Sequence, residues 1–315
     1  MRTILSCPEA FLVRLALVVG LLVTAACTAG VPATGPDSGN HGQPIGAGKT
    51  IAVVAAENFY GDVAAQVGGD RVRVVSILSD PSRDPHEYES NADDARAVAN
   101  ANVVVKNGLG YDAFVDKLMS ASPRSNRIVV DVGQLTGRED GDNPHQWYDP
   151  ATMPKVARRL AETYAQLDPA NRDYFDTRLQ AFMLAEKAVD DRIDAIKAKH
   201  RGVRVLATEP VFDPMSAALG LEVVDKDGPF QRAVEQGNDP PASAVARFRQ
   251  ELTTGGVKLF IYNSQAVTPI TTEMRSLAEQ NGVAIVAVSE TQPAGKTYQQ
   301  WMLDQLKTVE QALES

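Results

Sequence analysis

Two histidines stand behind prolines in a chain that has only four histidines: His86 in the stretch DPHEYES and His145 in DNPHQWYDP. Proline restricts the backbone, so both imidazoles are held in place before any ligand arrives. A preset ligand loses less entropy on binding, and neutral imidazole is a common metal ligand. These residue types suggest that the two nitrogens belong to one metal site.

The elements that must position these histidines follow from the pattern of apolar residues. Runs of Val and Ile alternate with amphipathic segments from residue 50 onward. We expect strands at residues 50–56, 71–79, 101–107, 127–132, 204–208, 221–226, 258–263 and 284–290. Helical patterns lie between most of them, at residues 92–101, 111–119, 241–252 and 268–282. Strands that alternate with helices and carry near-continuous apolar runs predict parallel sheets covered on both faces.

A strand-free stretch separates the first four expected strands from the last four. Residues 171–200 keep a helical apolar period for about thirty residues, which would span roughly 45 Å. That length suits a rod between two lobes. The sequence therefore predicts an α/β fold of two lobes, each with a four-stranded, mainly parallel sheet flanked by helices, joined by one long backbone helix. The expected boundaries are 50–165 for the N-terminal lobe, 166–200 for the linking helix and 201–315 for the C-terminal lobe.

Four candidate donors stand where the expected strands end, the place where open parallel sheets bind ligands. His86 follows the second strand and His145 lies after the fourth. Glu209 ends the fifth strand and Glu290 ends the eighth. A carboxylate at a strand end often only caps the next helix. Together, however, the four offer two imidazoles and two carboxylates to one divalent cation in the cleft between the lobes.

The first part of the chain has the features of an exported lipoprotein. The apolar run LALVVGLLVTAA (15–26) is too short to span a membrane and is typical of a signal peptide. It leads to Cys27, in a pattern that resembles a bacterial lipobox. We expect a signal peptide at 1–26, a Gly/Pro/Ser-rich tether at 27–49 and a lipid on Cys27 that anchors the protein to the outer face of the cytoplasmic membrane. Cleavage without lipid is the alternative.

Charge and cysteine content narrow the class of protein further. The formal net charge of −9, without basic clusters, argues against nucleic acid as a partner. The chain has two cysteines, Cys7 in the expected signal peptide and Cys27 at the expected lipid site. No thiolate would then remain for a disulfide or for the metal site.

From residue 50 to its end, the chain resembles the metal-binding solute receptors of bacterial ABC importers, the cluster A-I family of zinc and manganese receptors and adhesin-type lipoproteins. The resemblance rests on the segments AAENFYGDVAAQVGGDRVRVVSIL, DPHEYES, NGLGYDAFVDKL, NPHQWYDP, NDPPASAVARF and KTYQQWM. It implies two α/β lobes bridged by a backbone helix. It also implies metal ligands at His86, His145, Glu209 and Glu290, and transfer of the metal to a permease driven by a separate ATPase.

The identity of the metal is left open by these residues. Glutamate at the third ligand position is frequent in manganese receptors, and hard oxygens suit Mn²⁺ or Fe²⁺, but the same donors would bind Zn²⁺ more tightly at equal supply. Partners that orient the ligands are also needed. By position, the candidates are Asp149, Asp213 and Asn263.

Two other functions use the same features. A secreted metal-dependent hydrolase would need an open coordination position and a general base, and the chain has no HExxH motif or nucleophile elbow. A receptor for a siderophore or another organic ligand would need aromatic or arginine contacts, and aromatic residues make up only 6% of the chain. We therefore expect a monomeric receptor and not an enzyme; an adhesin role is left open.

Overall fold

The computed structural model describes residues 50–82, 85–254 and 256–315, so the expected signal peptide, tether and Cys27 lie outside the described residues. The first sheet contains β1 (Ile51–Glu57), β2 (Val72–Leu78), β3 (Val103–Lys106) and β4 (Ile128–Asp131). Its strand order is β2-β1-β3-β4, and all neighbours are parallel. All four strands overlap the ranges expected from the sequence.

The second sheet repeats this topology. It contains β5 (Arg204–Ala207), β6 (Glu222–Val223), β7 (Leu259–Asn263) and β8 (Ala284–Val288), in the order β6-β5-β7-β8 with parallel neighbours. The expected strand at 221–226 is shortened to β6 because Asp225 and Asp227 take positive φ angles of 61° and 54°, which turn the chain away from the sheet. Two four-stranded parallel sheets confirm the predicted fold class.

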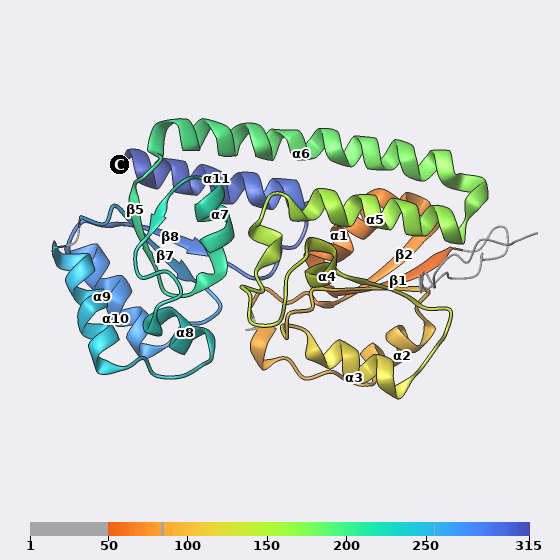
Figure 1. Ribbon diagram of the computed structural model, residues 1–315, viewed down its shortest axis with the longest axis horizontal. Helices are drawn as coiled ribbons and strands as arrows, with labels where there is room; N and C mark the ends of the chain where they lie inside the picture. Colours follow the sequence, from red (N-terminus) through yellow and green to blue (C-terminus); the bar gives the residue numbers. More distant parts are fainter. Residues whose placement is uncertain (1–49, 83–84, 255) are drawn as a thin grey trace, which may run out of the picture. The chain divides into compact units, whose positions relative to one another are not determined.

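Helices connect the strands and cover both faces of each sheet (Figure 1). The first lobe contains α1 (Asn58–Gly68), α2 (Ala92–Asn100), α3 (Ala113–Ala121), α4 (Val132–Thr136) and α5 (Thr152–Leu167). Then come the long α6 (Arg172–His200), α7 (Asp213–Ala218), α8 (Pro229–Glu235), α9 (Ala242–Thr254), α10 (Pro269–Gln280) and α11 (Tyr298–Glu314). Short 3-10 turns lie at Gly69–Arg71, Pro85–Glu87, Gln146–Tyr148, Pro169–Asn171 and Pro210–Phe212.

Local sequence explains several helix ends. Asn91 caps α2 and Thr268 caps α10, each through a reciprocal side-chain bond with the third residue of its helix. Thr297 caps α11 in the same way. Gly61, within α1, packs so closely on β2 that a Cβ atom would lie 2.0 Å from Ser76 Oγ. A larger residue at position 61 would therefore force the Ser76 side chain or the helix to move.

One hydrophobic core runs through both lobes. Alternate strand residues face it, for example Val53 of β1, Val205 of β5 and Ile261 of β7, together with Trp147 and Trp301. The opposite face of each sheet has a smaller core of its own, under α2 and α3 in the first lobe and under α8, α9 and α10 in the second. The shared core couples the two lobes mechanically.

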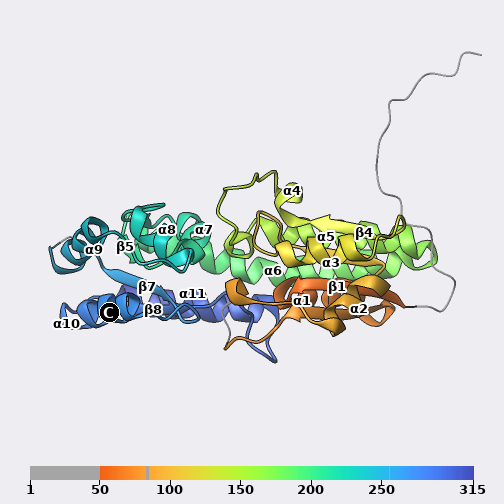
Figure 2. The ribbon, with the colours of Figure 1, turned by 90° about the horizontal axis from the view of Figure 1, so that it is seen from below.

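The helix α6 forms the backbone of this shared core. Its buried side chains include Phe182, Val189 and Ile196, and it packs against α5 and α11. In Figure 1, α6 runs beside α5 in the first lobe and beside α11 in the second. Figure 2 shows the molecule from below, with α6 passing behind both lobes. Among the described residues, no helix is both long enough and apolar enough to cross a membrane.

Candidate metal centre

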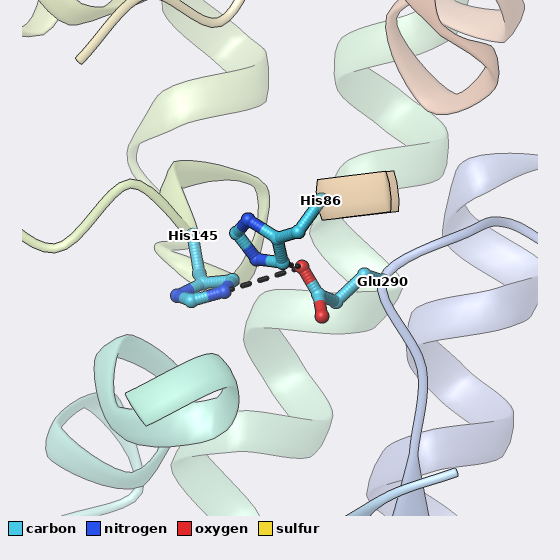
Figure 3. A group of neighbouring side chains, drawn as sticks. All are labelled: His86, His145 and Glu290. Carbon is cyan, nitrogen blue, oxygen red and sulfur yellow. Dashed lines mark ion pairs between the residues drawn. The ribbon is translucent and has the colours of Figure 1, made fainter. Parts of the chain in front are cut away.

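Three of the four predicted donors lie together at the ends of their strands. His86 is in the 3-10 turn Pro85–Glu87 after β2, His145 directly precedes the turn Gln146–Tyr148, and Glu290 lies two residues after β8. One ligand atom from each lies within 4.8 Å of the others, and Figure 3 shows both imidazoles pointing toward the carboxylate. The chain thus brings two nitrogens from the first lobe to one carboxylate from the second.

Glu290 is the centre of this group. Its Oε2 atom lies 3.3 Å from His145 Nε2 and 3.5 Å from His86 Nε2. The Glu290 side chain is fully buried, and burial alone would raise its pKa. Hydrogen bonding and charge attraction from the two imidazoles outweigh burial and lower the pKa well below its ordinary value. The carboxylate therefore stays ionised and available to a cation across the physiological pH range.

Asn143 fixes the protonation of the His145 ring. Its Nδ2 donates to the Pro210 carbonyl at 2.8 Å, and its Oδ1 accepts from the backbone N–H of His145 at 2.8 Å, so the orientation of the amide is set. The same Oδ1 lies 2.8 Å from His145 Nδ1. Because an amide oxygen can only accept, Nδ1 must carry a proton. Nε2 then donates to Glu290 Oε2 only while the ring is protonated; in the neutral ring the lone pair of Nε2 is directed to the same place and is free to bind a metal.

Further hydrogen bonds orient the carboxylate of Glu290. Asn263, at the end of β7, donates from Nδ2 to Glu290 Oε1 at 2.6 Å. Tyr111 donates from its hydroxyl to Glu290 Oε2 at 3.0 Å. The backbone N–H of Glu290 donates to Gln265 Oε1 at 2.6 Å. Since Oε1 is engaged by Asn263, Oε2 is the oxygen that faces the two imidazoles.

A constrained loop holds Tyr111 in this position. Gly108, Leu109 and Gly110 have consecutive positive φ angles of 74°, 57° and 80°. A positive φ is costly for leucine and persists only where the surroundings enforce it. Asp112 does so by accepting from the backbone N–H of Asn107 at 2.6 Å and of Gly108 at 2.9 Å. The sequence NGLGYD therefore builds a rigid support beside the site.

The fourth predicted donor is placed differently. Glu209 is buried, 4% exposed, just before the turn Pro210–Phe212. Among the described residues, the group with ligand atoms within 4.8 Å does not include it. Its backbone carbonyl accepts from Gln231 Nε2 at 3.5 Å. The structure therefore brings together His86, His145 and Glu290, and the role of Glu209 as a ligand stays a prediction.

The three residues proposed to orient the ligands have different surroundings. Asn263 contacts Glu290 directly. Asp213 is buried; burial raises its pKa to about 6, while the positive charges of Lys226 and His145 oppose that rise. Asp149 accepts from the backbone N–H of Ala151 at 3.0 Å, and its other oxygen lies 3.7 Å from the Arg138 guanidinium. Of these candidates, Asn263 has the contact that could orient a ligand.

Two residues of the site were not found from the sequence. The role of Asn143 could have been inferred from the local sequence, because asparagine side chains commonly accept a hydrogen bond from the backbone N–H two residues later, here that of His145. For Tyr111, the only local indication is the pair of glycines before it. Its contact with Glu290 joins residues 179 positions apart, so the sequence does not reveal it. Trp147 packs beside the imidazole of His145, and the two ring centres lie 5.2 Å apart.

A cleft of about 890 Å³ opens beside the three donors. One wall comes from the first lobe and carries His86, Tyr111 and Asn143, and the other comes from the segment between β5 and α9. Residues of this second wall are Pro210, Asp227, Gln231, Arg232, Val234 and Glu235. His86 lines this cleft, and His145 and Glu290 are buried behind it with their ligand atoms within 4.8 Å of that of His86. Two imidazoles and a carboxylate arranged in this way can hold a divalent transition metal.

Fold and site together define a two-lobed α/β binding protein with a candidate metal centre between its lobes. Residues 53–312 match the family described as zinc-uptake complex component A, periplasmic. Because this match covers most of the sequence, the chain belongs to that family, which confirms the resemblance found in the sequence.

Individual relatives agree with this assignment. The manganese-binding lipoprotein MntA of Halalkalibacterium halodurans is 25% identical over 186 residues, which are 56% of this chain and 60% of MntA. The metal ABC transporter substrate-binding lipoprotein SloC of Streptococcus mutans is 23% identical over 290 residues, 82% of this chain and 90% of SloC. The iron ABC transporter substrate-binding lipoprotein MtsA of Streptococcus pyogenes serotype M1 is 26% identical over 54% of this chain and 60% of MtsA.

Solved structures share the fold. The periplasmic zinc binding protein TroA from Treponema pallidum superposes with a TM-score of 0.69 at 20% identity, covering 84% of this chain and 99% of TroA. FpvC from Pseudomonas aeruginosa, in complex with Mn²⁺, has a TM-score of 0.69 at 21% identity and is covered over 98% of its length. At these identities the comparison establishes the architecture of two lobes on a backbone helix.

Proposed function

We propose that this chain is an extracytoplasmic receptor that binds one divalent transition metal ion and delivers it to an ABC permease. The observation that carries the proposal is the convergence of His86, His145 and Glu290, whose ligand atoms lie within 4.8 Å of one another. His86 also lines a cleft through which an ion could reach the group. Relatives named as substrate-binding lipoproteins of metal ABC transporters support it. Glu209 stays a candidate fourth ligand.

The donor set decides which ions suit the site. Two imidazole nitrogens and carboxylate oxygens, with no thiolate, fit Mn²⁺, Fe²⁺ or Zn²⁺. Carboxylate oxygens are hard ligands and favour Mn²⁺ or Fe²⁺, but the Irving–Williams order gives Zn²⁺ the higher affinity at equal concentration. The metal that the protein carries therefore depends on supply as well as on the site.

The role we infer is stoichiometric capture and transfer, without catalysis. The sequence contains no Walker motif, so ATP hydrolysis belongs to a partner ATPase that drives the permease. The core shared by both lobes limits hinge opening, so release proceeds through small shifts of one cleft wall. We further propose that a lipid on Cys27 holds the receptor at the outer face of the cytoplasmic membrane.

Titration of metal-free protein with Mn²⁺ and Zn²⁺, in competition with a chelator, tests the proposal. We expect one ion per chain. We expect His145→Ala and His86→Ala each to lose more than the roughly 10- to 100-fold in affinity that is typical for residues outside the coordination shell. His200→Ala is the matched control, because His200 is at the end of α6. Unchanged metal affinity in His145→Ala would refute the function.

A further inference from the structure

Glu290 lies on a segment that connects the two lobes. This segment, residues 289–297, joins the end of β8 to the start of α11. The second sheet holds its first part, where Asn263 donates to Glu290 Oε1 at 2.6 Å and Gln265 accepts from the Glu290 backbone N–H at 2.6 Å. Its last part lies against helix α1 of the first lobe. The position of Glu290 therefore depends on bonds from both lobes.

Helix α1 presents a row of three polar side chains, Asn58, Asp62 and Gln66, to this segment. They are spaced four residues apart, so they lie on one face of the helix. Asn58 forms two bonds with the backbone of Gln292, a residue that is buried. Its Nδ2 donates to the Gln292 carbonyl at 2.8 Å, and its Oδ1 accepts from the Gln292 N–H at 3.1 Å. Asn58 thus satisfies both polar groups of a buried backbone residue.

The other two side chains of this row hold the start of α11. Tyr298 is the first residue of α11, and its backbone N–H, which has no partner within the helix, donates to Asp62 Oδ2 at 2.8 Å. A carboxylate is favourable there because the N-terminus of a helix carries partial positive charge. Gln66 donates from Nε2 to Gln299 Oε1 at 3.0 Å. The row therefore fixes residues 292–299 against the first lobe.

The bonds between Asn58 and Gln292 act close to the metal donors. Gln292 is two residues after Glu290, and Pro293 restricts its backbone, so a shift of Gln292 is passed on to Glu290. The distances between a metal and its ligands hold to within about 0.2 Å. Without its bonds to Asn58, Gln292 could move, and the Glu290 carboxylate would lose its alignment with the two imidazoles.

We propose that Asn58 is a positioning residue for metal binding, and that it acts through Gln292 on Glu290. The inference rests on the proposed function and deepens it by assigning part of the metal affinity to helix α1. None of the described residues that line the cleft belongs to α1. Gln292 engages the Asn58 amide through both its nitrogen and its oxygen. The effect of Asn58 on the ion is therefore indirect.

A double-mutant cycle tests this inference, with the affinity for Zn²⁺ measured by chelator competition. Such donors bind Zn²⁺ more tightly than Mn²⁺, so weakened variants stay measurable. We expect Asn58→Ala to lower the affinity about tenfold. In Glu290→Ala the ligand that Asn58 positions is gone, so adding Asn58→Ala should change the affinity by less than about twofold. Asn100→Ala is the matched control and should bind Zn²⁺ like the unchanged protein, because the Asn100 amide donates to the Arg96 carbonyl of its own helix.

The outcomes separate this inference from the proposed function. If His145→Ala loses the metal while Asn58→Ala binds Zn²⁺ within about threefold of the unchanged protein, the receptor function stands and the role of Asn58 is refuted. A loss of about tenfold from Asn58→Ala in both backgrounds would also refute it, because Asn58 would then act on the whole fold and not on Glu290. Asn58→Asp keeps the shape and the acceptor of the side chain. It replaces Asn58→Ala in the cycle, with the same expected pattern, if urea unfolding shows that the alanine variant does not fold.

Discussion

Replacing Asn143 with alanine should weaken metal binding about tenfold, although Asn143 would not touch the metal. Its Oδ1 is the acceptor for His145 Nδ1–H at 2.8 Å, and this bond directs the free lone pair of Nε2 into the site. In Asn143→Ala, the His145 ring can change tautomer and rotate. Metal binding would then have to restore the tautomer and the orientation of the His145 ring, which lowers the affinity.

The magnitude follows from the change in this hydrogen bond on metal binding. Without metal it joins two neutral groups and contributes about 0.5–1.5 kcal/mol. When a cation binds Nε2, the ring N–H becomes more polar and the bond approaches the 1.5–3 kcal/mol of a bond to a charged group. A difference of about 1.4 kcal/mol is tenfold in affinity. Loss of ring orientation adds to this, within the roughly 10- to 100-fold range of such partners.

Chelator competition with Mn²⁺, on metal-free Asn143→Ala and Asn143→Asp, measures the effect. Aspartate keeps an oxygen acceptor for His145 Nδ1–H but removes the donor to the Pro210 carbonyl. We therefore expect Asn143→Asp to bind at least as tightly as the unchanged protein, and Asn143→Ala to bind about tenfold more weakly. Two results would show that the bond to His145 does not set the affinity. One is an alanine variant that binds Mn²⁺ within about threefold of the unchanged protein, and the other is an equal loss of affinity in both variants.

Two further predictions concern stability and anchoring. Burial and the nearby charge of Asp190 raise the pKa of Glu186, on α6, from its ordinary value of 4.5 to about 7, so the fold loses stability as the pH rises from about 4.5 to 7. Glu186→Gln should therefore stabilise the protein by up to about 3 kcal/mol at pH 8, and hardly at all at about pH 3, where Glu186 is protonated in both states. Urea unfolding that gives equal gains at both pH values would contradict this. Cys27→Ala should release the protein from the membrane fraction in a bacterial host, and mass spectrometry of the unchanged protein should find acylated Cys27; an unmodified cysteine would disprove the anchor.

The fold was predictable because the central strands of both sheets are buried on both faces. Runs such as VVVK at β3 and LFIYN at β7 are continuous in apolar residues, as parallel sheets require. The long helix was predictable from its apolar period. The helices α1 and α11 were not predicted from the pattern of apolar residues. Gly61 weakens the helical pattern of α1, and its reason is a close approach to Ser76 that only the tertiary structure provides.

The site was predictable only in part, because strand ends specify where a residue lies but not where its side chain points. His86, His145 and Glu290 converge as the shared edge of parallel sheets implies. Glu209 also stands at the end of an expected strand, yet its carboxylate is not among the ligand atoms that lie within 4.8 Å of one another. Tyr111 contacts Glu290 across a separation of 179 residues, and nothing local in the sequence reveals such a contact.

The hydrogen bonds around Glu290 indicate how a protein with one continuous core can still release a metal. Glu290 follows a strand of the second sheet, but its segment is tied to the first lobe: Tyr148 donates to the Ser289 carbonyl at 2.8 Å, and Asn58 Nδ2 donates to the Gln292 carbonyl at 2.8 Å. These bonds fix the Glu290 segment against the first lobe, which carries His86 and His145. We infer that the α8 wall of the cleft can shift away from the three donors without disturbing the core under α6, and that the ion leaves through the cleft that opens.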